Sequence, residues 1–286
     1  MKRAVVIAVA AFLAGAAAVA VPAHMGADQI LLVLLATAGA ALAAALAVRL
    51  AMEERSRREI EEARRQLVAA ASHDLRTPLA SLRLLVESID DGVATGETRD
   101  RYLKEIRTHV AVLSDLIDDL FELSRIEAGD ISWTMRQVKV RELIGDTVAA
   151  MRAPAAERGV SLAAELPAGD LLASANAEKV QRVLFNLIQN AIRHTPADGS
   201  VTVRARSAAG GVEVEVADDG EGIPAGDGER VFEAFYRGDA ARGEDGAGLG
   251  LAISRAIVEA HGGKIWFEDG SPGTRVHFTL KSANER

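Results

Sequence analysis

Residues 71–85, ASHDLRTPLASLRLL, place a histidine, an acid, a hydroxyl and a proline in a stretch whose apolar spacing predicts a helix. At about 100° per residue, His73 lies roughly 100–160° around this helix from the apolar positions, so its imidazole should face solvent. Asp74 is adjacent, and Thr77 follows at i+4 on the same face. Pro78 removes one backbone hydrogen bond and loosens the helix there. An exposed imidazole beside a carboxylate and a hydroxyl suits chemistry on a ring nitrogen, although for this stretch taken alone a solvated surface histidine is the favoured explanation.

A second group of polar side chains lies along VLFNLIQNAIRHT, residues 183–195. Asn186, Asn190 and Arg193 recur at i, i+4 and i+7, so a helix aligns them on one stripe opposite leucine and isoleucine side chains. Amide oxygens suit a hard cation, and an arginine suits phosphate. A polar outer helix face is the alternative interpretation of the same stripe.

Two glycine motifs follow. In DDGEGIP, residues 218–224, the glycines let the backbone approach a flat ligand while a carboxylate accepts from an exocyclic amine. Residues 232–263 form a long polar loop that enters a helix through Gly246, Gly248 and Gly250. Glycines at a helix start expose N–H groups and the positive end of the dipole to phosphate, and so polar a loop is typical of a lid. Each motif alone is also compatible with a plain turn.

The elements around these motifs mix strands and helices. In residues 139–282, the strand-like runs VTVRARS, VEVEVAD, KIWFED and TRVHFTL alternate with the helical runs EKVQRVLFNLIQNAIRHT and AISRAIVEAHGG. This mix predicts an α/β sandwich with helices on one face of a mixed sheet.

The region before it is helical. Residues 51–70 are charged, lack glycine and proline, and predict a continuous helix, which continues along 68–89 with apolar residues spaced alternately by four and three. Glycines in 90–98 break it, and residues 103–124 repeat the spacing in a second helix that ends near Gly129. One antiparallel hairpin leaves an apolar stripe on each helix. Two copies would close a four-helix bundle, so we expect a homodimer.

The first fifty residues predict a membrane hairpin. Residues 4–21 and 30–48 are uncharged stretches of about the length that spans a bilayer core. Basic residues precede the first and follow the second, whereas the loop PAHMGADQ between them has none, which predicts a multi-pass protein of the inner (plasma) membrane with both termini cytoplasmic. A cleaved signal peptide is the alternative for the first stretch. So short a loop predicts input from the bilayer or from a partner membrane sensor protein.

Composition excludes several classes of function. The chain of 286 residues has no cysteine, which rules out disulfides, thiolate zinc sites and cysteine nucleophiles. The formal net charge is −8, and because the first fifty residues are net positive, the remainder is more acidic still. An acidic soluble part argues against nucleic acid as a partner, since phosphate backbones bind basic faces.

The stretch SHDLRTPLASL resembles the H-box of the sensor histidine kinases of two-component systems. The later motifs, in their order, resemble the N, G1, F and G2 boxes of the catalytic domain of that family, whose fold is shared with gyrase and MutL-type ATPases. The resemblance covers residues 60–282. With the membrane segments it implies a membrane hairpin (1–50), a signalling helix (51–66), a HisKA-type dimerisation and phosphotransfer domain (67–129), a linker (130–138), a HATPase_c catalytic domain (139–282) and a tail (283–286).

The same resemblance implies roles for individual residues. His73 would be the phosphoacceptor, Asp74 the general base, and Thr77 the residue that positions a water to dephosphorylate the response regulator. The implied cofactors are ATP and Mg²⁺. Asn186 and Asn190 would bind magnesium, and the phosphates would be contacted by Arg193, Gly246, Gly248 and Gly250. Asp218 would bind the adenine amine, Gly220 and Gly222 would line the base, and Thr274 would support it through a water. Arg237 in the lid would stabilise the transferred charge.

The chain departs from the family pattern at two places. The family usually has lysine–tyrosine where this chain has Arg193 and His194. Arginine can serve phosphate, and stacking of His194 on adenine stays open. Only about 25 residues separate the second apolar stretch from His73, too few for the HAMP linker module common in the family. We therefore expect signals to pass directly from the membrane span to the helix.

We predict a membrane-bound kinase that phosphorylates itself on His73 from ATP and passes the phosphoryl group to an aspartate of a cognate response regulator, with phosphatase activity towards that regulator. One alternative is a gyrase-like clamp that hydrolyses ATP without phosphorylating itself; acid-labile phosphate on His73 distinguishes the two. A second is a catalytically silent membrane scaffold, which Asn190, Asp218 and the two glycine motifs oppose.

Overall fold

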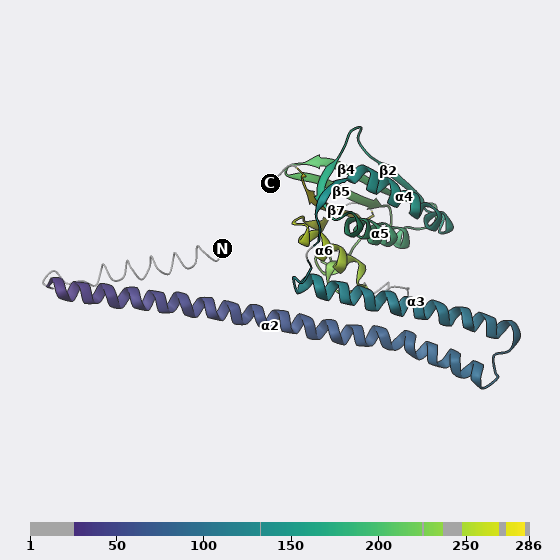
Figure 1. The fold of residues 1–286 in the computed structure, drawn as a ribbon, viewed down its shortest axis with the longest axis horizontal. Helices are drawn as coiled ribbons and strands as arrows, with labels where there is room; N and C mark the ends of the chain where they lie inside the picture. Colours follow the sequence, from purple (N-terminus) through teal and green to yellow (C-terminus); the bar gives the residue numbers. More distant parts are fainter. Residues whose placement is uncertain (1–25, 132, 225, 237–247, 269–272, 284–286) are drawn as a thin grey trace. The chain divides into compact units, whose positions relative to one another are not determined.

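The computed structural model describes residues 26–131, 133–224, 226–236, 248–268 and 273–283 (Figure 1). The chain divides into two compact units, Met1–Ala69 and Ala70–Arg286. The described part of the first unit is the beginning of helix α2 (Ala27–Asp90). Its segment Leu35–Met52 is long and apolar enough to cross a membrane. This segment overlaps the span predicted at 30–48, whereas the span predicted at 4–21 lies outside the described residues.

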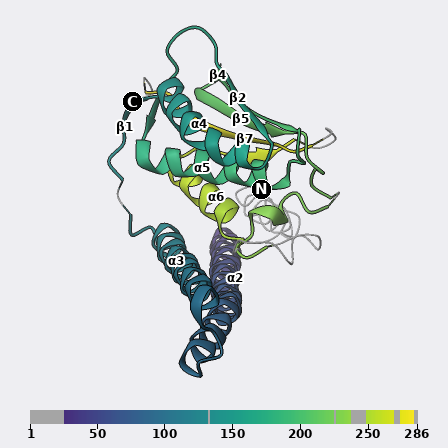
Figure 2. The same cartoon turned by 90° about the vertical axis from the view of Figure 1, so that its right-hand side faces the viewer.

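The helical hairpin has the predicted form. Helix α2 runs without interruption through the charged stretch and ends at Asp90, and α3 (Gly96–Glu127) follows after a short loop. The end of α2 is closed by hydrogen bonds from Gly92 N to Ile89 O (3.1 Å) and from Ala94 N to Ser88 O (2.9 Å). Both views show the last turns of α2 antiparallel to α3 (Figures 1 and 2).

The C-terminal part of the chain is built on a five-stranded sheet in the order β2-β4-β5-β7-β6. The strands are β2 (Ser161–Glu165), β4 (Ser200–Ala208), β5 (Gly211–Asp218), β6 (Ile265–Phe267) and β7 (Arg275–Lys281). The β2–β4 pair is parallel and the other pairs are antiparallel, so the predicted mixed sheet is confirmed. A separate two-stranded sheet joins β1 (Arg136–Lys139) to β3 (Leu172–Ala175).

Three helices cover one face of the sheet: α4 (Val140–Glu157), α5 (Ala177–His194) and α6 (Gly250–Ala260) (Figure 2). Alternate strand residues such as Val203, Val214 and Phe278 are fully buried beneath them, because successive side chains of a strand point to opposite faces. A short 3₁₀ turn, η1 (Arg230–Phe232), precedes α6 and buries Phe232. The core therefore lies between the sheet and the helices, as the alternation of strand and helix patterns predicts.

Candidate active site

Asp218 is the last residue of β5 and lies at the centre of the candidate site. Its Oδ1 accepts hydrogen bonds from the backbone N–H groups of Gly220 (2.9 Å) and Thr274 (3.1 Å), and its own N–H donates to the carbonyl of Thr274 (2.9 Å). Burial raises the pKa of Asp218, although the bonds from Gly220 and Thr274 and the nearby His194 act in the opposite direction. These contacts fix one carboxylate oxygen in place and leave the second free of backbone N–H partners among the described residues.

The glycines around Asp218 are required by close backbone approach. A Cβ at Gly220 would collide with the carbonyl of His194, and a Cβ at Gly273 would collide with the carbonyl of Asp218. Gly222 and Gly273 also have positive φ (79° and 80°), where a side chain is strained. Gly220 and Gly222 were predicted from the sequence, whereas Gly273 was not. The Pro–Gly pair before Thr274 was the available signal for a turn there.

Helix α5 brings its polar stripe to the start of α6. Asn186 Nδ2 donates to the carbonyl of Gly250 (3.0 Å) and lies 3.4 Å from Ser254 Oγ, which itself donates to Gly250 (2.8 Å). The opposite side of α5 is buried, as predicted. Its buried members are Val180, Val183, Leu184, Leu187, Ile188, Ala191 and Ile192. Asn190 and Arg193 remain half-buried and His194 is exposed, so the stripe faces away from the core.

The entry to α6 has the conformation that its glycines permit. Gly248 has φ +70°, and a Cβ there would lie 2.8 Å from the carbonyl oxygen of Tyr236. Its carbonyl accepts from Phe235 N (3.1 Å), which ties the two ends of the intervening loop together. Gly250 is the first residue of α6 and packs beside Asn186. Arg237 and Gly246, which the sequence analysis also named, lie outside the described residues.

A buried histidine that the sequence analysis did not identify joins α5 to α6. His261 follows α6, and its Nε2 accepts from the backbone N–H of Asn176, the residue that caps α5 (3.0 Å). Its Nδ1 lies 2.7 Å from the carbonyl of Ile257, to which it donates as the neutral tautomer. Burial lowers the pKa of His261, and the ring of Trp133 lies 5.1 Å from it. Because its role depends on burial and not on a surface motif, no sequence pattern distinguishes it.

Comparison with known proteins adds the family. Residues 63–129 match the family described as "His Kinase A (phospho-acceptor) domain". Residues 175–284 match the family described as "Histidine kinase-, DNA gyrase B-, and HSP90-like ATPase". The chain belongs to the sensor histidine kinases. Both domains lie in the order that the motifs predict, and the family resemblance found in the sequence is confirmed.

Curated relatives of the chain are also sensor histidine kinases. The chain is 34% identical over 239 residues to the sensor histidine kinase WalK of Bacillus subtilis, a match that covers 80% of this chain and 38% of WalK. It is 32% identical over 225 residues to the sensor-like histidine kinase SenX3 of Mycobacterium tuberculosis, covering 77% of this chain and 54% of SenX3. The chain thus spans about half or less of the length of these relatives.

A solved structure shares the arrangement of domains. The histidine kinase ThkA, in complex with the response regulator protein TrrA, has a TM-score of 0.65 and 26% sequence identity to this chain, covering 82% of this chain and 67% of that one. The likeness therefore extends over both the hairpin and the catalytic domain.

An ionic cluster joins the hairpin helix α3 to α5. Arg182 pairs with both Asp119 and Glu122, and Lys179 Nζ lies 2.9 Å from Glu122. Burial raises the pKa of Asp119, and the neighbouring Arg182 opposes that shift. The cluster places the first turns of α5 directly against α3.

The residues of the H-box lie in α2. Thr77 is exposed there, and its carbonyl accepts from Ser81 Oγ (3.3 Å). The side chains of His73 and Asp74 lie outside the described part of the structure. Their roles stay predictions of the sequence.

Proposed function

We propose that the chain is an ATP-dependent protein-histidine kinase that phosphorylates His73 and transfers the phosphoryl group to an aspartate of a response regulator. The observation that carries the proposal is the convergence of Asp218, Gly220 and Thr274 in an ATPase-type domain that follows a phosphoacceptor-type hairpin. Asp218 presents a fixed carboxylate acceptor to the adenine amine, and Gly220 lets the turn that holds this carboxylate approach the carbonyl of His194 closely.

The phosphate end of the nucleotide fits the start of α6. Gly248 and Gly250 leave the backbone open at a helix N-terminus, where N–H groups and the dipole favour phosphate. Asn186 uses its Nδ2 to bond Gly250, which leaves its Oδ1 for a cation, and Asn190 lies one turn further along α5. This donor set fits Mg²⁺, which would supply charge neutralisation at the phosphates. Arg193 would contact phosphate, and Arg237 would act from the lid.

The phosphorylation step assigns the remaining chemistry to the hairpin. A ring nitrogen of neutral His73 attacks the γ-phosphorus, the bond to the leaving oxygen of ADP breaks, and Asp74 takes up the imidazole proton. In the separate phosphatase reaction, Thr77, one turn along, orients a water that attacks the phospho-aspartate of the regulator, which releases inorganic phosphate and restores the aspartate. ThkA in complex with TrrA supports a response regulator as the partner.

We also propose that the kinase is a homodimer. The apolar residues that recur at alternating spacings of four and three on the two hairpin helices are only partly covered within one chain. Leu79 and Val86 on α2 are 60% and 43% exposed, and Val110 and Ile117 on α3 are 50% and 42% exposed. Apolar residues left exposed at heptad spacing need a partner surface, and a second hairpin supplies one.

Membrane attachment is part of the same proposal. The exposed apolar segment Leu35–Met52 of α2 supports one span. A second span at 4–21, with both termini in the cytoplasm, rests on the sequence alone. A partner membrane sensor protein or the bilayer itself would then supply the input.

The direct test is acid-labile label from γ-³²P-labelled ATP on the purified full chain in detergent. His73→Gln should abolish the label and keep ATP affinity, because no nucleotide contact is removed. His109→Gln, a histidine substitution on α3 of the same hairpin, is the matched control and should retain label. Undiminished label in His73→Gln would refute the assignment, and ATP hydrolysis without any label would favour the gyrase-like clamp.

A further inference from the structure

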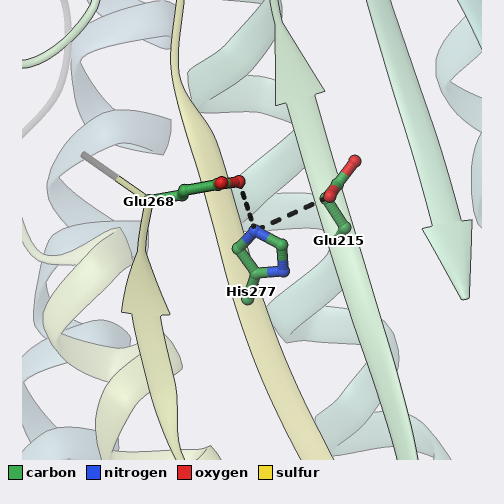
Figure 3. A group of neighbouring side chains, drawn as sticks. All are labelled: Glu215, Glu268 and His277. Atoms are coloured by element: carbon green, nitrogen blue, oxygen red, sulfur yellow. Dashed lines mark ion pairs between the residues drawn. The ribbon is translucent and has the colours of Figure 1, made fainter. Parts of the chain in front are cut away.

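The face of the sheet opposite the helices carries a cluster of charged side chains around one buried imidazole. Glu215 on β5 lies directly opposite His277 on β7, and Glu268 follows β6 on the other side (Figure 3). The side chain of His277 is only 9% exposed, and the ring of Trp266 stacks on it at 5.3 Å with an interplanar angle of 9°. The imidazole is therefore held in one plane between two carboxylates.

Among the described residues, one nitrogen of this imidazole has a hydrogen-bond partner and the other has none. His277 Nδ1 lies 3.2 Å from Glu213 Oε1, a carboxylate that also accepts from Arg206 (2.7 Å). Nε2 is buried and has no hydrogen-bond partner among the described residues. Because the bond to Glu213 places the proton on Nδ1, the lone pair of Nε2 points at the two carboxylates. A carboxylate that orients the far nitrogen of a metal-binding histidine is the usual outer shell of such sites.

The distances between these groups suit a metal ion. Nε2 lies 3.6 Å from Glu215 Oε2 and 3.6 Å from Glu268 Oε2. Both distances are longer than the roughly 2.7–2.9 Å of a charge-assisted N–H···O hydrogen bond. Two ligands of a tetrahedral zinc ion, each about 2.0–2.2 Å from the metal, lie about 3.4 Å apart, close to the spacing found.

Glu215 can bind a metal ion without losing its present partner, and Glu268 would give up only a loose contact. Glu215 pairs with Arg204 through Oε1 (2.7 Å), which leaves Oε2 facing His277. Glu268 is half exposed, and its contact with Arg275 is loose at 3.7 Å, so its side chain can turn inward. The three ligand atoms lie within 4.8 Å of one another. Two carboxylates also balance the charge of a divalent ion.

We propose that Glu215, Glu268 and His277 bind a divalent transition-metal ion of the zinc class, on the face of the sheet opposite the helices. Imidazole nitrogen selects zinc, cobalt or nickel over magnesium, so the site is distinct in chemistry from the amide oxygens of α5. With no cysteine in the chain, thiolates do not compete for the ion. A bound ion would tie β6, held to β7 by three residue pairs, to the central strand β5.

The test is titration of Zn²⁺ into the full chain in detergent, by calorimetry without nucleotide. Wild type should bind one ion per chain. Glu268→Gln removes a half-exposed ligand without opening the core and should weaken binding at least about tenfold, since losing even an outer-shell partner weakens metal sites about 10- to 100-fold. Glu165→Gln, which removes another exposed carboxylate that pairs with Arg204, is the matched control and should bind as wild type.

A second readout uses the stacked indole. The chain has only two tryptophans, so in a Trp133→Phe background all tryptophan fluorescence comes from Trp266, which stacks on His277. Co²⁺ should quench this fluorescence, and Glu268→Gln should weaken the quenching as it weakens Zn²⁺ binding. Absence of Zn²⁺ binding, or equal binding in wild type and Glu268→Gln, would overturn the site and leave the cluster as an ion-pair network. Neither measurement involves ATP or phosphorylation, so the outcome is independent of the proposed kinase activity.

Discussion

Substitution of Asp218 by asparagine should weaken ATP binding by a predictable amount. Oδ1 of Asp218 accepts from two backbone N–H groups, those of Gly220 and Thr274. In the Asp218→Asn variant the amide oxygen must stay on those two donors, because the reversed orientation would set an NH₂ group against both. The NH₂ then faces the adenine amine, and two donors meet where a donor and a carboxylate met before.

The loss is that of one charge-assisted hydrogen bond, about 1.5–3 kcal/mol, which corresponds to about a ten- to a hundredfold weaker affinity. Calorimetric titration with a non-hydrolysable ATP analogue measures it. Asp219→Asn is the matched control, because Asp219 instead accepts from Ser200 N (2.8 and 3.0 Å) and Ser200 Oγ (3.0 Å), away from the base. The control should lose thermal stability and keep its affinity. Equal affinities in wild type and Asp218→Asn would refute the adenine assignment.

The same substitution has a second expected effect, on stability without nucleotide. Burial raises the pKa of Asp218. For a carboxyl with a raised folded-state pKa, its contribution to stability is full below the unfolded pKa of about 3.9 and is lost as the pH rises through the folded pKa. At neutral pH the ionised group therefore opposes folding, and Asp218→Asn should not lower the apo Tm. A lower Tm would mean that the carboxylate is held for packing and not for ligand binding.

Three other predictions follow from the site. Thr77→Ala should keep autophosphorylation near normal and lose phosphatase activity towards the regulator, because only the water-orienting hydroxyl is removed; equal slowing in both time courses would make Thr77 structural. Burial lowers the pKa of His261 in the folded state. Its contribution to stability is therefore present above the unfolded pKa of about 6.5 and is lost as the pH falls through the lower folded pKa. We expect the Tm to decrease between about pH 7.5 and about pH 5, and to decrease less steeply in His261→Gln. Parallel Tm curves for the two proteins would show that other groups carry the acid sensitivity. Gly220→Ala should reduce ATP affinity at least about tenfold by forcing the backbone away from the carbonyl of His194, measured in the same titration, and unchanged affinity would contradict the close approach.

Long periodic segments could be predicted from the sequence because burial imposes their pattern. The hairpin helices, the buried side of α5 and the alternating strands β4, β5 and β7 repeat over many residues. The short strands β1, β2 and β3 and the helix α4 were not predicted individually. Only one residue of β1 is even half-buried, so its four residues carry no alternation to find. The apolar segment Leu35–Met52 overlaps the span predicted at 30–48, because a run of apolar residues long enough to cross a bilayer is visible in composition alone.

The candidate site was predictable where its chemistry lies in local motifs. Asp218, Gly220 and the glycines before α6 stand in short motifs, whereas Gly273 and His261 serve contacts with residues far away in the chain. Asn186 was predicted as a cation ligand, but its bond to Gly250 depends on how α5 and α6 meet, which no spacing encodes. Such contacts exist only once the fold has formed.

The ionic cluster between α3 and α5 links the orientation of α5 to that of the hairpin helix. The first turns of α5 are held to α3 through Arg182, while its far end carries His194 beside the nucleotide site. The roughly twelve residues between them span about 18 Å at about 1.5 Å per residue. A tilt of about 10° imposed on the held end would therefore carry the far end about 3 Å, the difference between a hydrogen-bonded and a separated pair. A small movement of a hairpin helix would in this way displace the end of α5 that lies beside the proposed adenine site.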